Sequence, residues 1–279
     1  MMPYHKQSGQ IVLITLLVLA VGTTLALSLI ARTTIDTAIS SQVEESLRAF
    51  SAAEAGIEEA LRSGQGSGGA QVLTPGVTYS VNVTSVGGAE GVYQLSKKTS
   101  AGVTETVWFV DHNPDGSINE TLTFTGENLD ICWSYESGTE PAIAISILYK
   151  KSDGSYRVAR DAFDPVASRA NTNKFKSVPS PPSGGCDQTN YYKTNISFAS
   201  YGINPVSDIL LALRLRPVYA NTQFAFNPGN FQIPLQGSRI DSVGVTAVGV
   251  TRKVSVDKIY TSAPTLFDAA VYSQGSFSH

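Results

Sequence analysis

The apolar positions of the chain follow two different periods, one before and one after residue 64. Residues 10–31 contain no charged side chain, and about 20 such residues form a helix that crosses the hydrocarbon core of a bilayer. The next residues keep apolar side chains at helical spacing, on one face: Ile35, Ile39, Val43, Leu47, Phe50, Ile57 and Leu61. We therefore predict one long helix over residues 10–63, with a transmembrane segment at 10–31.

After residue 64, apolar and polar positions alternate with the period of a β-strand, most clearly at 77–83, 92–95, 103–111 and 243–260. The simplest arrangement pairs strands from both ends of this part in one antiparallel sheet that packs on the second half of the helix. Residues 64–112 and 237–279 would form this head. Residues 113–236 would form an inserted β-sandwich-like module, with candidate strands at 122–124, 131–135, 143–149, 156–159, 196–198, 209–215 and 224–226. The predicted fold class is α+β.

The composition fits a folded chain and argues against catalysis. Hydrophobic residues make up 42% and charged residues 15%, and the net charge of -3 gives no overall attraction for nucleic acid. The histidines (His5, His112 and His279) have no partners at metal-ligand or catalytic spacing. We therefore expect no enzyme and no cofactor. An exported hydrolase whose carboxylates meet only in three dimensions stays open, because sequence spacing cannot detect such a site.

Cys132 and Cys186 both follow the apolar segment. If this region is exported, the two can form a disulfide, which would stabilise the head by about 4 kcal/mol through closure of a long loop. The alternative is two unrelated buried thiols that behave as small apolar side chains.

The N-terminal part resembles the type IV minor pilins in three features. A short leader with Lys6 ends in Gly9, an apolar run follows at once, and residues 50–57 read FSAAEAGI. The resemblance implies that a prepilin peptidase cuts between Gly9 and Gln10, so that residues 1–9 are a leader peptide. It also implies that the helix packs with other pilin subunits, through Ile14, Ile35, Ile39, Val43, Leu47, Phe50, Glu54, Gly56, Ile57 and Leu61.

One position departs from the pilin pattern. The fifth residue after the expected cut is Ile14, where the family usually has a glutamate. In the family that glutamate neutralises the N-terminal amine of a neighbouring subunit in a core of low dielectric, where an unpaired charge is costly. The resemblance therefore implies a minor or initiating subunit rather than the main building block.

The expected function is thus a minor pilin-like subunit of a type IV pilus or related secretion filament. It would be a single-pass membrane protein with an extracytoplasmic head, extracellular once assembled. One alternative is a membrane-anchored adhesion or carbohydrate-binding module that never enters a filament. Another is a secretory signal peptide, because small residues at 24–26 offer a cleavage site.

Residues 111–120 match the start of a calcium loop, with a glycine at the sixth position and oxygen-bearing side chains at the first, third, fifth and ninth: Asp111, Asn113, Asp115 and Asn119. The twelfth position is Leu122 instead of the usual glutamate. The same residues also suit a hairpin turn between two strands. We expect the turn and keep weak calcium binding as the alternative.

Basic residues gather between positions 150 and 176, near Tyr149 and Tyr156. The cluster comprises Lys150, Lys151, Arg157, Arg160, Arg169, Lys174 and Lys176. It predicts either a contact surface for DNA or a solvated strand face that protects a sheet edge. We favour the strand face. A surface ligand or DNA is thus a possible partner of the head.

Overall fold

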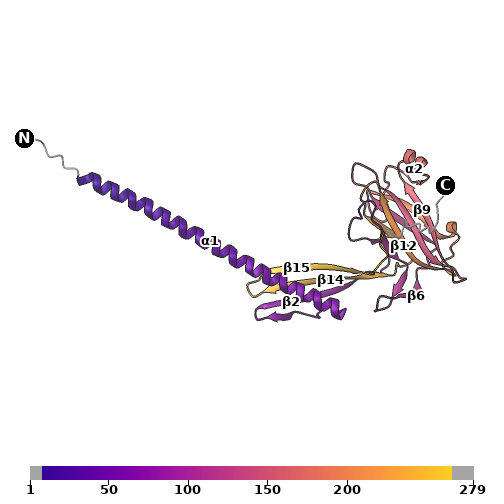
Figure 1. The fold of residues 1–279 in the computed structure, drawn as a ribbon, viewed down its shortest axis with the longest axis horizontal. Coiled ribbons are helices and arrows are strands. Elements are labelled where there is room, and N and C mark those ends of the chain that lie inside the picture. The colour runs from indigo at the N-terminus through magenta and orange to yellow at the C-terminus, as the bar shows by residue number, and fades with distance from the viewer. Residues whose placement is uncertain (1–7, 266–279) are drawn as a thin grey trace, which may run out of the picture. The chain divides into compact units, whose positions relative to one another are not determined.

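The computed structural model describes residues 8–265 (Figure 1). The chain folds into two compact units, and each is described by itself. Within the described residues, the first unit comprises residues 8–83 and 240–256, and the second comprises 84–239 and 257–265. The predicted fold class is confirmed: one long helix packs on a sheet, and the remainder is rich in antiparallel strands.

The first unit contains the helix α1 (Ser8–Ser63) and most of a four-stranded sheet in the order β1-β2-β14-β15. The strands span Gln71–Thr74 (β1), Val77–Gly87 (β2), Leu235–Thr246 (β14) and Thr251–Ile259 (β15). Strands from both ends of the part after residue 64 thus share one sheet, as expected for the simplest arrangement. At about 1.5 Å per residue, α1 is about 80 Å long.

The face of α1 that covers the sheet consists almost entirely of small residues. It buries Ala49, Ala52, Ala53, Gly56, Ile57 and Ala60. A Cβ atom at Gly244 of β14 would lie 1.9 Å from the backbone oxygen of Ala49, and one at Gly56 would lie 2.3 Å from Oγ of Ser242. Helix and strand backbones therefore approach so closely that only glycine fits at either position. The string AAEAG supplies the small residues that this contact needs.

The second unit is a β-sandwich. One sheet has the order β10-β9-β8-β12-β4 and the other β11-β7-β13-β3. The first comprises Lys176–Ser177, Tyr156–Asp164, Ala142–Lys150, Ile209–Val218 and Glu105–Trp108; the second comprises Tyr191–Ser197, Asn128–Ser134, Phe224–Asn227 and Tyr93–Gln94. A separate hairpin pairs β5 (Val110–His112) with β6 (Ile118–Thr123).

Alternate residues of the two sheets form one shared core. Ile143, Ile145 and Ile147 of β8 belong to the same buried cluster as Ile131 and Trp133 of β7. The indole N–H of Trp133 donates to the carbonyl oxygen of Pro141 at 2.9 Å, so this fully buried ring leaves no polar group unpaired. The core explains why each strand alternates apolar and polar positions.

The unit boundaries differ from the expected ones at 113 and 236. Residues 84–112 belong to the second unit because their strands pair there: β3 pairs with β13, and β4 pairs with β12. Strand pairing between distant segments decides this, and the alternation of single strands carries no information about partners.

The segment at 164–190 is rich in Ser, Pro, Gly and Asn, and this composition predicts a long loop. The structure differs, because the segment contains the short helix α2 (Ala167–Asn173) and β10. A buried ion pair holds this helix. The guanidinium of Arg169 donates to both carboxylate oxygens of Asp164, at 2.6 and 2.7 Å, and to the carbonyl oxygen of Glu140 at 2.8 Å. A tertiary contact therefore stabilises a helix that has one buried residue, Ala170.

Gly244→Ala should destabilise the first unit, because the new methyl group would overlap the backbone of α1 at Ala49. Overpacking of this kind costs about 1–3 kcal/mol, against the small gain that alanine gives in an unconstrained strand. Thermal unfolding of the full-length protein in detergent measures the effect. Gly69→Ala is the matched control, since a Cβ atom there meets nothing within 4 Å. Equal melting temperatures for the two variants would contradict the close contact.

Candidate functional site

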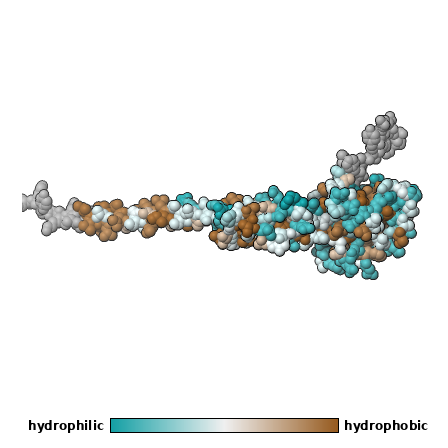
Figure 2. All heavy atoms as spheres, turned by 90° about the horizontal axis from the view of Figure 1, so that it is seen from below, coloured by the Kyte–Doolittle hydropathy of each residue, from teal (hydrophilic) through white to brown (hydrophobic). Residues whose placement is uncertain are grey.

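The first candidate site is the outer surface of α1, which the sheet leaves uncovered. α1 is long and apolar enough to cross a membrane near the N-terminus. On the face that Figure 2 shows, hydrophobic residues dominate its N-terminal half. Most of the predicted packing residues have 41–61% of their surface exposed: Ile14, Ile35, Ile39, Val43, Leu47, Phe50 and Leu61.

Two of the predicted packing residues lie elsewhere. Gly56 and Ile57 are buried against the chain's own sheet, where Ile57 shares a core cluster with Val81 and Ile240. Both are therefore covered within the chain, because the helix turns its small-residue face inward. Glu54 is exposed on the helix surface.

The predicted leader lies mostly outside the described residues, since residues 1–7 are not described. Gly9 and Gln10 fall in the first turn of α1. Cleavage between them stays a prediction.

The two cysteines form a disulfide in the structure. Cys132 of β7 bonds to Cys186, 54 residues later, with their Cα atoms 6.1 Å apart. Both are buried, together with Tyr191 and Ala225, on the side of the four-stranded sheet that faces away from the main core. The bond ties the segment between β10 and β11 to this sheet.

The predicted calcium ligands form a hairpin turn between β5 and β6. Asp115 Oδ1 accepts the backbone N–H of Ser117 at 2.9 Å, and Asn113 donates to the Ser117 hydroxyl at 2.9 Å. Asp111 and Asn119 each accept a nearby backbone N–H, at 2.8 and 3.1 Å. The hydrogen bonds from the hydroxyl and backbone of Ser117 lower the pKa of Asp115. Within residues 8–265, no three His, Cys, Asp or Glu side chains are grouped to hold a metal.

The basic residues between 150 and 176 are largely paired with carboxylates. Lys150 binds Glu120 at 2.6 Å, and Lys151 binds Asp208 at 2.9 Å. Arg169 and Lys176 pair with Asp164 and Asp161. Burial raises the pKa of Asp208, but hydrogen bonds from the backbone N–H of Asn204 and from the Lys151 ammonium lower it by a larger amount. The pKa of Asp208 is therefore below its ordinary value. Among the described residues, Arg157, Arg160 and Lys174 form no ion pair with a carboxylate, so the pairing removes only part of the positive charge that could meet the phosphates of DNA.

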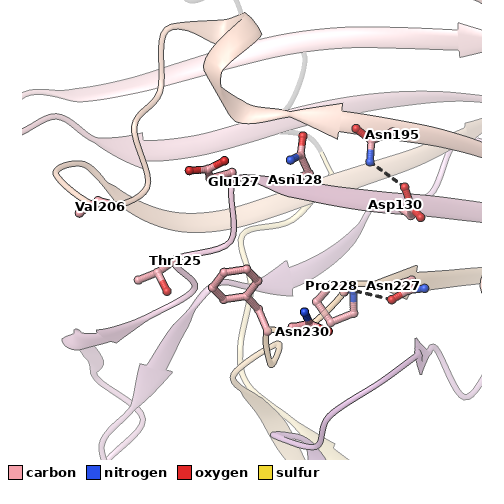
Figure 3. A pocket seen from close by; sticks show the side chains of 11 residues that line it. Thr125, Glu127, Asn128, Asp130, Asn195, Val206, Asn227, Pro228 and Asn230 are labelled. Carbon is pink, nitrogen blue, oxygen red and sulfur yellow. Dashed lines mark hydrogen bonds between the residues drawn. The ribbon is translucent and has the colours of Figure 1, made fainter.

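The second candidate site is a groove of about 730 Å³ in the second unit (Figure 3). The β7 strand and the residues just before it contribute Thr125, Glu127, Asn128 and Asp130. The opposite wall is the segment that follows β13, with Asn230 and Phe231. Neighbouring elements complete the lining with Asn195, Val206, Asn227, Pro228 and Gly229.

A tight turn presents Asn230 and Phe231 to the groove. The side-chain oxygen of Asn227 accepts the backbone N–H of Gly229 at 3.0 Å, and Gly229 has a positive φ of 67°. The backbone N–H of Phe231 donates a hydrogen bond to the carbonyl oxygen of Pro228 at 3.3 Å. Asparagine and glycine suit these positions because one bonds its own backbone and the other tolerates φ > 0.

The polar side chains of the groove fall into two groups. Asp130 is engaged, because it accepts the side-chain amide of Asn195 at 2.7 Å and pairs with Lys193 at 2.7 Å. Glu127, Asn128 and Asn230 are exposed, and none of these three side chains hydrogen-bonds to another described residue. They hold unused donors and acceptors beside the groove.

The ring of Phe231 is half-exposed, and its buried side packs against Phe124 and Gly126. Its centroid lies 5.9 Å from that of Phe124, at an interplanar angle of 66°. A Cβ atom at Gly126 would lie 2.5 Å from Cζ of Phe124 and 3.1 Å from Cδ2 of Phe231. The missing side chain at Gly126 therefore makes room for this aromatic pair.

A second hollow of about 640 Å³ adjoins the groove. It shares Thr125, Asn230 and Phe231 with the first hollow. Phe231 thus lines both hollows.

Sequence reasoning missed this groove, because its residues come from several separate segments. The one available signal was the string NPGNF at 227–231, where turn residues precede an aromatic residue that no alternating pattern accounts for.

No protein-family model matches the sequence, and a search of curated proteins found no significant match. The chain is characterised by its architecture, which is pilin-like: one long apolar N-terminal helix followed by a β-rich head.

Calcium should leave the melting temperature of the protein unchanged up to about 1 mM, because the hairpin side chains already bond locally and the twelfth loop position lacks a carboxylate. Thermal unfolding with calcium, and with the chelator EDTA, measures this. A saturable rise in melting temperature that Asp115→Ala abolishes would contradict the prediction.

Proposed function

We propose that this protein is a minor pilin-like structural subunit of a type IV pilus or a related secretion filament. It is anchored by α1 in the membrane before assembly and joins neighbouring subunits through the same helix. The observation that carries this proposal is the apolar stripe of α1, which continues beyond the length that a bilayer can cover and which the chain's own sheet does not cover.

The stripe is defined by Ile35, Ile39, Val43, Leu47 and Phe50. A bilayer covers about 20 residues of a helix, so the segment at 10–31 fills it and the stripe lies outside. Single exposed apolar residues are ordinary, but a row of them at helical spacing marks a contact surface. Burying one such side chain completely yields about 1.5–3 kcal/mol.

A second helix of the same kind is the partner that fits best. The stripe lies beside the small-residue face that the sheet already occupies, and most of the charged residues of this region lie on the other faces. A long, one-sided apolar surface on a straight helix matches another long helix. Sister subunits carry such a helix, which is buried first in lipid and later among its neighbours.

The disulfide and the residue at position 14 supply further support. Disulfides persist in oxidising compartments outside the cytoplasm, which agrees with an extracytoplasmic head. Ile14 stands where the resemblance leads one to expect a glutamate, so this subunit lacks the charge that pairs with a neighbour's amine. This favours a minor or initiating position, and the work of the helix is packing rather than catalysis.

The endogenous protein should begin at Gln10 with a methylated amine, because the resemblance places prepilin peptidase cleavage after Gly9. Mass spectrometry of the protein purified from its native membrane tests this. Gly9→Leu should leave the leader attached, whereas Gly22→Ala, a change at an open glycine of the same helix, should not. A native N-terminus just after Ala26 would instead show signal peptidase cleavage and remove the anchor.

Val43→Asp combined with Leu47→Asp should lower the amount of protein in sheared filaments by more than about tenfold. Assembly would bury two carboxylates without partners, which costs several kcal/mol. Insertion into the membrane should be unchanged, because both positions lie beyond residue 31. Ser41→Asp, on the opposite side of the helix, is the matched control. The anchored-module alternative predicts that no filament fraction contains the protein at all.

A further inference from the structure

We infer that the groove beside Phe231 binds a neutral oligosaccharide, with the Phe231 ring against a sugar face and Glu127, Asn128 and Asn230 bonding hydroxyl groups. All of these residues lie in the second unit. The inference goes beyond filament assembly and holds whether or not the chain assembles.

The polar side chains of the groove match the chemistry of sugar hydroxyls. Each hydroxyl both donates and accepts, and neighbouring hydroxyls on a sugar ring lie side by side. An asparagine amide offers two donors and an acceptor, and a carboxylate offers two acceptor oxygens in one plane. Either group can therefore bond two adjacent hydroxyls. Glu127, Asn128 and Asn230 have this capacity free within the described part of the chain.

The aromatic ring supplies the apolar contact that such a ligand needs. Sugars carry patches of C–H groups on the faces of their rings, and a flat aromatic side chain covers them. Phe231 has 42% of its surface exposed, while Phe124 and Gly126 fix it from behind. A ring held before binding loses little conformational freedom on binding, which favours affinity.

Charge argues against an anionic ligand. No lysine or arginine lines the groove, and the nearby ammonium of Lys193 is engaged by Asp130. Glu127 would repel a sialic acid, a sulfate or a phosphate. An anionic glycan or a nucleic acid therefore fits this surface poorly.

The two adjoining hollows that Phe231 lines suit a linear ligand of several units. A single sugar would fill only part of the combined space. A peptide is the competing occupant, but peptides are held by strand pairing or by several apolar pockets. The groove offers one aromatic anchor among amides and carboxylates.

A glycan array with neutral, sialylated and sulfated oligosaccharides tests this inference, with peptides printed beside them. The probe protein is the full chain in lipid nanodiscs. We expect retention of neutral oligosaccharides that is insensitive to salt between about 0.1 and 0.5 M, a range that strongly weakens ionic contacts. Retention of no glycan, of anionic glycans alone or of peptides alone would overturn the inference.

Variants then locate the site with the best neutral glycan of the array in titration calorimetry. Phe231→Ala and Asn230→Ala should each weaken binding about tenfold or more, as expected for central contacts. Tyr156→Ala removes an aromatic ring of β9 with 67% exposure that does not line the groove, and it should bind as the unchanged protein does.

Asn128→Ala is the variant that should leave the fold intact, because this exposed side chain has no hydrogen-bonding partner among the described residues. It should keep the thermal transition and still weaken binding. Unchanged affinity in both Asn128→Ala and Phe231→Ala would place the ligand elsewhere and overturn the inference.

Discussion

The contact between α1 and its sheet constrains everything that the helix can do. At Gly244 the backbone of β14 lies directly against the backbone of α1, and Gly56 leaves room for Ser242 on the other side of the contact. Neither element can rotate without placing a larger residue in this space. The contact therefore fixes which face of α1 is buried within the subunit, and by exclusion which face carries the apolar stripe.

One face of α1 is buried against the sheet and another is exposed, and this explains why residues of one apolar pattern differ in burial. Ile57 and Leu61 continue the spacing of the stripe, yet Ile57 is buried in the chain's own core while Leu61 is 41% exposed. Small residues face inward because the strand β14 approaches the helix so closely at Ala49 and Gly56 that larger side chains would not fit. Larger residues face outward, where a partner can interdigitate with them.

In the second unit, a rigid sandwich supports short connecting segments that carry the polar chemistry. The groove residues extend from the ends of β7, β11 and β13, and the turn at 227–231 is fixed by its own hydrogen bonds. The scaffold limits the motion of these side chains, as is usual for binding sites borne on loops. Buried ion pairs such as Asp164–Arg169 and the disulfide at Cys132 fix other connecting segments to the sandwich.

The sequence by itself determined the long helix and the β-rich remainder, because period and charge are local properties of the chain. It also pointed to the hairpin at 111–120, since turn residues act on their own backbone. Only the tertiary structure decided the unit boundaries, the helix α2 and the inward direction of Gly56 and Ile57. It alone brought Glu127, Asn128 and Phe231 to one groove, because strand partners and side-chain neighbours distant in sequence leave no local pattern.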